Sequence, residues 1–178
     1  MHKNSRVGYL NRIKGNVDVC LAEGSCLDHK IVASGPSSYF EGKNRSKLTL
    51  REGSHILNGY LNLTDSITLG KNSTVAGSGS EFWTHSFYIG TNLSRVDGEI
   101  VIGDNCYIGS KCIFMPGVKV CNDVIVGAGS CVSKTLTEKG IYVNQPLRHL
   151  PVQADEAIKK FGAPIGHIGG CKIYKRNI

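Results

Sequence analysis

The sequence is poor in aromatic residues and has no long apolar segment. Aromatic side chains make up 7% of its 178 residues, and there is a single Trp. No apolar run approaches the roughly 20 residues that a membrane-spanning helix needs, so no membrane span is predicted. The first ten residues carry charge, but no apolar segment follows them, which argues against a cleaved secretory signal. We therefore expect the protein to be cytoplasmic.

Paired cysteine motifs are also missing. The chain has seven Cys, an odd number, and no two of them form a Cys-x-x-Cys pair. No His or Cys spacing resembles a zinc site, so no metal is expected. Disulfides are not expected in a reducing compartment. Free cysteines commonly behave as small buried apolar residues, and we expect this of Cys106 and Cys112.

The formal net charge of +7 favours anionic partners. The Lys and Arg residues are scattered along the chain and are not gathered in one segment. Nucleic-acid binding is therefore not predicted, because the phosphates of a small ligand would satisfy this charge.

A period of six residues is the strongest pattern in the sequence. From Ile102 the chain reads IGDNCY, IGSKCI, FMPGVK, VCNDVI and VGAGSC, with Ile, Phe or Val first in every hexad. This period drifts around a 3.6-residue helix, and the Gly content disfavours helix. Short parallel strands joined by turns fit it, with three hexads to a triangular coil. Ile102 then lies under Val120, and Ile108 under Val126.

Earlier segments repeat the pattern less regularly, as LAEGSC at 21–26, LREGSH at 50–55 and LGKNST at 69–74. The phase breaks between Val75 and Ile102, which predicts an extruded loop around 77–100. Loops on a rigid scaffold often carry function.

The hexads stop after Gly140. Residues 151–162 have acidic side chains early and basic ones late, which suits a short helix. We expect a β-helix domain over 1–150 and a C-terminal helical or cap extension over 151–178.

The stretch IVIGDNCYIGSKCIFMPGVKVCNDVIVGAGSCVSK resembles hexapeptide-repeat acyltransferases, the group of galactoside, maltose and polysaccharide O-acetyltransferases. The resemblance implies an all-β, left-handed parallel β-helix that assembles as a homotrimer, with active sites between subunits. It also implies acetyl-CoA as the acyl donor and a hydroxyl of a sugar or glycan precursor as the acceptor.

The family's catalytic His stands in a Thr-His pair upstream of the hexads. Here Thr84-His85 precedes IGDNCYIGS, so the resemblance assigns His85 as the general base. A neutral imidazole can take the proton of the acceptor hydroxyl as that oxygen attacks the thioester. The neighbouring aromatic residues, Phe82, Trp83 and Phe87, are expected to hold the ring and shield it from water.

The resemblance also assigns contacts with the substrates. Trp83 is expected to contact the acceptor, as is an Asn of an early coil, for which Asn62 is the candidate and Asn58 its competitor. The positions that match the family's coenzyme A groove are Tyr107, Ser110, Ala128, Ser133, Lys134 and Arg148. Asn144 stands where the family has Gly, and its side chain is expected to narrow that groove.

Other functions are compatible with the same sequence. The same His serves N-acylation of an amino (nucleotide) sugar, and the donor could carry a longer acyl chain than acetyl. A zinc carbonic anhydrase with the same coil needs three converging His, but no His-x-x-x-x-His pair occurs here. A non-catalytic β-helix scaffold would bind no acetyl-CoA.

Overall fold

The computed structural model describes residues 2–37, 45–89, 93–144, 166–168 and 171–173. The chain divides into two compact units, Met1–Asn144 and Gln145–Ile178. In the second unit, β21 (Gly166–Ile168) and β22 (Cys171–Ile173) pair antiparallel. The helix predicted over 151–162 lies outside the described residues. No helix in the described ranges is long and apolar enough to cross a membrane.

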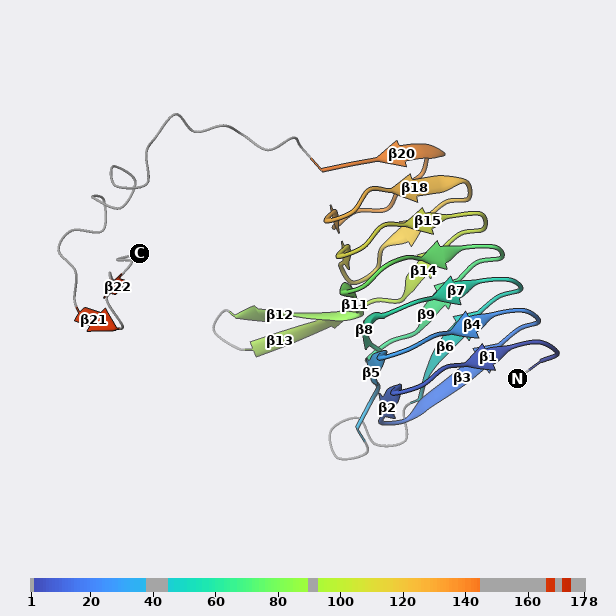
Figure 1. The fold of residues 1–178 in the computed structure, drawn as a ribbon, viewed down its shortest axis with the longest axis horizontal. Helices are drawn as coiled ribbons and strands as arrows, with labels where there is room; N and C mark the ends of the chain where they lie inside the picture. The colour runs from blue at the N-terminus through green and yellow to red at the C-terminus, as the bar shows by residue number, and fades with distance from the viewer. Residues whose placement is uncertain (1, 38–44, 90–92, 145–165, 169–170, 174–178) are drawn as a thin grey trace. The chain divides into compact units, whose positions relative to one another are not determined.

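The first unit is a prism with three parallel sheets as its faces (Figure 1). Face A holds β1 (Arg6–Val7), β4 (Cys26–Leu27), β7 (His55–Ile56), β10 (Thr74–Val75), β15 (Tyr107–Ile108), β18 (Val124–Val126) and β20 (Gly140–Tyr142). Face B holds β2 (Arg12–Lys14), β5 (Val32–Ser34), β8 (Gly59–Asn62), β11 (Ser80–Trp83), β16 (Ile113–Phe114) and β19 (Cys131–Val132). Face C holds β3 (Val17–Leu21), β6 (Ser46–Leu50), β9 (Ile67–Leu69), β14 (Ile100–Ile102) and β17 (Lys119–Val120).

The strand register confirms the predicted hexads. Ile102 pairs with Val120, and Ile108 pairs with Val126. The same columns continue through the less regular N-terminal repeats, in which Leu21, Leu50 and Leu69 lie in register beneath Ile102. All of these side chains are buried, and each buried aliphatic group contributes about 1.5–3 kcal/mol of transfer free energy. The all-β prediction is confirmed, and this repeating register is consistent with a left-handed parallel β-helix.

The corner between faces C and A depends on left-handed backbone. One residue in each of five successive coils has positive φ there: Gly24, Gly53, Asn72, Asn105 and Asp123. Gly, Asn and Asp are the residues that adopt this conformation at least cost. The amide of each position from Gly53 onward donates to a carbonyl of the coil before it, as in Asn105 N to Lys71 O at 2.8 Å. The Gly, Asn and Asp of the hexads are therefore corner residues.

A hairpin interrupts the coil after β11. β12 (His85–Ile89) and β13 (Leu93–Asp97) pair antiparallel and project from the prism (Figure 1). The amide of Gly98 donates to the carbonyl of Thr84 at 2.8 Å, which closes the hairpin at its base. The excursion is thus shorter than the predicted 77–100, because Ser80–Trp83 stay in face B, paired with β8 and β16.

Cys106 and Cys112 lie inside the prism, as predicted. Their thiols point at carbonyls of the next coil, Cys121 O at 3.2 Å and Gly127 O at 3.3 Å. Burial raises the pKa of both thiols, so less of the reactive thiolate forms at a given pH. The exposed Cys20 and Cys131 have no such protection.

We expect alkylation of the native protein at mildly alkaline pH to label Cys20 and Cys131 much faster than Cys106 and Cys112. Peptide mass mapping after timed exposure to iodoacetamide measures each site separately. In denaturant the four sites should react alike. Native labelling of Cys106 at the rate of Cys131 would contradict the buried placement.

Candidate active site

His85 lies at the corner between faces B and C. It is the first residue of β12, directly after the chain leaves the coil at Thr84. Its side chain is half-buried. The coil beneath contributes the residues that follow β8, because Asn62 at the end of β8 pairs in register with Trp83 at the end of β11. The predicted base therefore lies at the corner between faces B and C, directly above the turn that follows β8 in the coil below.

Two oxygen atoms contact one nitrogen of the imidazole. Nδ1 of His85 lies 2.9 Å from Oδ1 of Asn62 and 2.9 Å from Oγ1 of Thr64. The described residues make no hydrogen bond to Nε2. One side of the ring is thus held by the prism, and among the described residues the other nitrogen has no hydrogen-bond partner.

The surroundings of Asn62 fix the direction of these bonds. Its Oδ1 also accepts from the backbone N–H of Thr64 at 3.4 Å, which identifies this atom as the amide oxygen. An amide oxygen cannot donate, so Nδ1 of His85 carries the proton and Nε2 keeps its lone pair. A neutral imidazole in this tautomer has the form that a general base requires.

Thr84 secures the corner from inside. Its side chain is fully buried, and its hydroxyl donates to Asn62, with the backbone O at 2.9 Å and Oδ1 at 3.1 Å. The same hydroxyl accepts from the N–H of Asp65 at 2.9 Å. Asn58, the competing candidate, instead bonds the carbonyl of His29 and the N–H of Gly79. Of the two Asn residues, only Asn62 contacts the His85 side chain.

Aromatic rings flank His85 on the outside of the prism. Trp83 and Phe87 both meet the imidazole edge-on, with ring centroids 6.3 Å and 5.2 Å away. Trp83 also packs on Tyr60 at 5.1 Å, and its indole N–H donates to Glu81 Oε2 at 2.9 Å. Phe87 is 53% exposed, so its cover is partial.

The expectation that Phe82 holds the imidazole is wrong. Successive side chains of a strand point to opposite faces, so Phe82 points inward where Trp83 points outward. Phe82 is 1% exposed and stacks on Phe114 at 4.7 Å inside the prism.

Three of the predicted cofactor residues lie away from His85 on the same chain. Tyr107 is on the outer side of face A and is half exposed. Ser110 and Ala128 turn the corner between faces A and B, where Gly129 N donates to Ser110 O at 2.8 Å. Residues 111–115, the side of the prism that contains β16, separate this corner from the corner of His85, about 15 Å at the rise of a β-strand.

Ser133 and Lys134 share the corner of His85. They follow β19, which lies two strands beyond β11 in face B, about 10 Å along the prism. Both side chains are exposed and line a cavity of 180 Å³ together with Tyr142 and Asn144. The Asn144 amide donates to the carbonyl of Gly129, beside Ala128. Arg148 lies outside the described residues.

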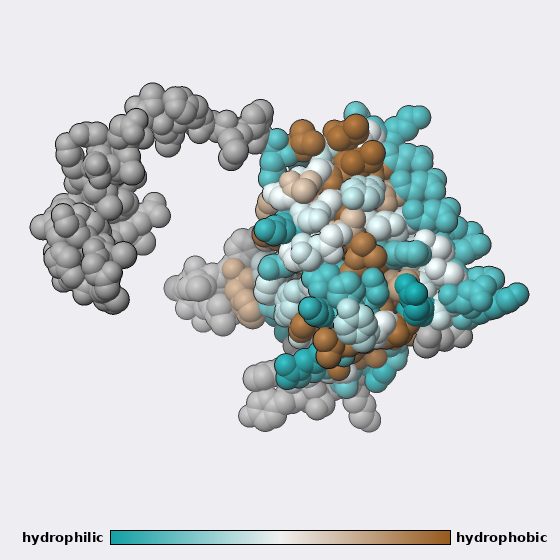
Figure 2. Space-filling model, in the orientation of Figure 1, coloured by the Kyte–Doolittle hydropathy of each residue, from teal (hydrophilic) through white to brown (hydrophobic). Residues whose placement is uncertain are grey.

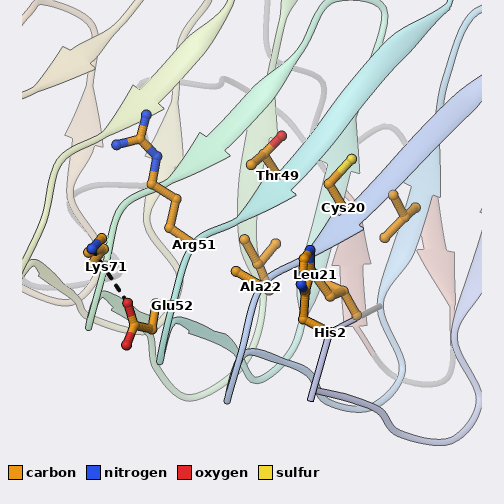
Figure 3. A pocket seen from close by; sticks show the side chains of 10 residues that line it. His2, Cys20, Leu21, Ala22, Thr49, Arg51, Glu52 and Lys71 are labelled. Carbon is orange, nitrogen blue, oxygen red and sulfur yellow. Dashed lines mark ion pairs between the residues drawn. The ribbon is translucent and has the colours of Figure 1, made fainter. Parts of the chain in front are cut away.

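The larger described cavity, of 460 Å³, is elsewhere (Figure 3). It lies over β3 and β6 and the turns that follow them. It has an aliphatic floor that includes Leu21 and Ala22, with Arg51 and an ion pair of Lys71 with Glu52 at 3.4 Å beside it. None of the predicted site residues lines it. Within the described ranges no cluster of three His, Cys, Asp or Glu is placed to hold a metal ion.

The comparisons with known proteins agree with the repeat. Residues 99–134 match the family described as bacterial transferase hexapeptide (six repeats). This match covers about a fifth of the chain, and over this segment the chain is similar to that family. The chain is 29% identical over 98 residues to "Putative acetyltransferase YvoF" of Bacillus subtilis (strain 168). That alignment covers 54% of this chain and 55% of YvoF, so the chain spans about half the length of this relative.

Solved structures share the fold at low sequence identity. AntD, an N-acyltransferase from Bacillus cereus in complex with dTDP and 3-hydroxybutyryl-CoA, superposes with a TM-score of 0.63 at 17% identity, over 90% of this chain and 86% of AntD. A maltose O-acetyltransferase from Clostridium difficile 630 gives 0.51 at 20% identity, over 83% of this chain and 66% of that enzyme.

Proposed function

We propose that the protein is an acyl-CoA-dependent acyltransferase that transfers an acetyl group to a hydroxyl of a sugar or glycan precursor, with His85 as general base. The observation that carries the proposal is the His85 imidazole itself. Its Nδ1 is held by Asn62 and Thr64, while Nε2 is unengaged within the described structure. The hexapeptide family match supports acyl transfer as the class of reaction.

The geometry suits a single proton shuttle. Nε2 of His85 takes the proton of the acceptor hydroxyl as that oxygen forms a bond to the thioester carbonyl carbon. The tetrahedral intermediate then collapses, the carbon–sulfur bond breaks, and the coenzyme A thiolate leaves with the proton from the imidazolium. Oδ1 of Asn62 stabilises the transient cation, because an oxygen acceptor on Nδ1–H bonds more strongly to a charged ring.

In this proposal the active site is shared between two protomers. His85, Asn62, Ser133 and Lys134 occupy one corner of the prism, and Tyr107, Ser110 and Ala128 occupy face A and a different corner. A homotrimer in which the first corner of one copy meets the second of its neighbour would bring the two groups together around coenzyme A.

An apolar strip on face A supports this arrangement. Tyr107 and Ile125 pair in register on its outer side, followed by Ile141 in the next coil. They are 49%, 43% and 70% exposed, respectively. Apolar surface gathers over the β18–β20 end of this face (Figure 2). Large exposed apolar residues in one strip suit a protein interface.

N-acylation of an amino sugar is the second candidate. It is favoured by the structural likeness to AntD, an N-acyltransferase whose structure holds dTDP and 3-hydroxybutyryl-CoA. The imidazole would accept a proton from an attacking amine in the same way. The donor in that structure also makes longer acyl chains reasonable candidates.

A turnover screen tests the proposal. We expect the purified protein to release free coenzyme A from acetyl-CoA in the presence of one class of acceptor among sugars, nucleotide sugars and amino sugars. Thiol release is followed with a chromogenic disulfide, and mass spectrometry of the product assigns the acetyl group to oxygen or nitrogen. 3-Hydroxybutyryl-CoA tests donor length. Failure to bind any acyl-CoA, measured by calorimetry, would favour the non-catalytic scaffold.

A further inference from the structure

The hydroxyl of Thr64 lies as close to Nδ1 of His85 as the amide oxygen of Asn62 does, both at 2.9 Å. Thr64 lies in the turn after β8, one coil below His85, and is half-buried. Its backbone N–H also donates to Asn62 Oδ1. Thr64 therefore contacts both members of the His85–Asn62 pair.

Asn62 Oδ1 favours the neutral tautomer with a proton on Nδ1, and the Thr64 hydroxyl can add a second acceptor for that proton. If Nδ1 carried no proton, its lone pair would face the Asn62 oxygen at 2.9 Å, and two acceptors at that distance repel each other. With Nδ1 protonated, the N–H lies between Asn62 Oδ1 and Thr64 Oγ1, which share it. When Nε2 gains a proton, both oxygens face a cation and their bonds strengthen.

We propose that Thr64 is a positioning residue for His85: its hydroxyl and Asn62 Oδ1 clamp Nδ1–H, keeping the lone pair on Nε2 and aiming it outward. The catalytic consequence rests on the proposed function, but the clamp itself does not. Thr84 supports it from inside the prism, because its hydroxyl binds both the backbone and the side chain of Asn62.

Three variants separate the hydroxyl from the shape of the side chain. Thr64→Val replaces the hydroxyl by a methyl group, Thr64→Ser retains the hydroxyl, and Thr68→Val makes the same change at a half-buried position on face C, outside the site. All three should keep the melting temperature close to that of the wild type if the prism is unaffected.

Nitrogen-15 NMR of labelled histidine reads the tautomer without any substrate. We expect the wild type and Thr64→Ser to show protonated Nδ1 and unprotonated Nε2 for neutral His85, assigned by comparison with His85→Ala. Thr64→Val should show a mixture of tautomers. An unchanged tautomer in Thr64→Val would overturn the clamp, whatever the activity of the protein.

Kinetics test the catalytic consequence. Thr64→Val should lower kcat by about 10-fold or more with little change in KM, because fewer imidazoles present the lone pair at Nε2. Thr64→Ser should recover most of the rate. Equal kcat in Thr64→Val and wild type would refute a positioning role. If the tautomer shifts but even the wild-type protein transfers no acyl group, the clamp stands and the proposed function fails.

Discussion

Replacement of His85 by alanine is expected to lower kcat/KM for acyl transfer by about 10²–10⁴-fold, the usual contribution of a general base. No other described side chain that binds the imidazole can take its place. Asn62 and Thr64 bind its protonated nitrogen, and Trp83 and Phe87 contact it only through their rings. Binding of acyl-CoA should persist, because the residues proposed to hold the cofactor are unchanged.

The matched control is His29→Ala. His29 also lies at a corner of the prism and is partly exposed, but it stacks on Tyr9 and pairs with Asp28. We expect this variant to retain the wild-type rate. The assignment of His85 fails if both variants transfer acyl groups at the same rate on the best acceptor.

Co-expression of two inactive variants is expected to restore activity if the site is shared between protomers. His85→Ala removes the imidazole, and Ala128→Trp fills the exposed corner proposed to hold the pantetheine arm. Each protein alone should be nearly inactive. In each mixed trimer one of the three sites combines an intact imidazole with a neighbour's intact corner, so on the order of a third of wild-type activity should return.

The control for this experiment pairs His85→Ala with Asn62→Ala. Both residues belong to one corner of one protomer, so no mixed oligomer contains an intact site and no activity should return. Two affinity tags, one on each variant, allow the mixed oligomers to be isolated and assayed. Isolated mixed oligomers of His85→Ala with Ala128→Trp that stay inactive would place the whole site in a single chain.

The fold could be predicted from the sequence because the apolar first position of each hexad marks a side chain that points into the core. The first position of each hexad from Ile102 to Val126 lies in the core, and the turn residues between them adopt the corner conformations. Phe82 shows where the prediction failed. It was assigned to the loop because the six-residue phase breaks there, although the two-residue alternation of Ser80–Trp83 points Phe82 inward.

The site was predictable only in part. The Thr84-His85 pair predicts this corner through resemblance, which also gives Asn62 and Asn58 as competing candidates for the Asn of an early coil. Thr64 was missed, since its contact with His85 depends on the register between β8 and β11, which the phase break obscures. The division of the cofactor residues between two corners is likewise a property of coil geometry and not of any motif.

The hydrogen bond from the Gly98 amide to the Thr84 carbonyl bears on how proteins with this fold can vary in sequence. The β12–β13 hairpin leaves and rejoins the prism at one point. A hairpin of another length or composition could therefore replace it without disturbing the parallel strands of the coils above and below. The residues of the hairpin can then change while the prism that holds the imidazole keeps its shape.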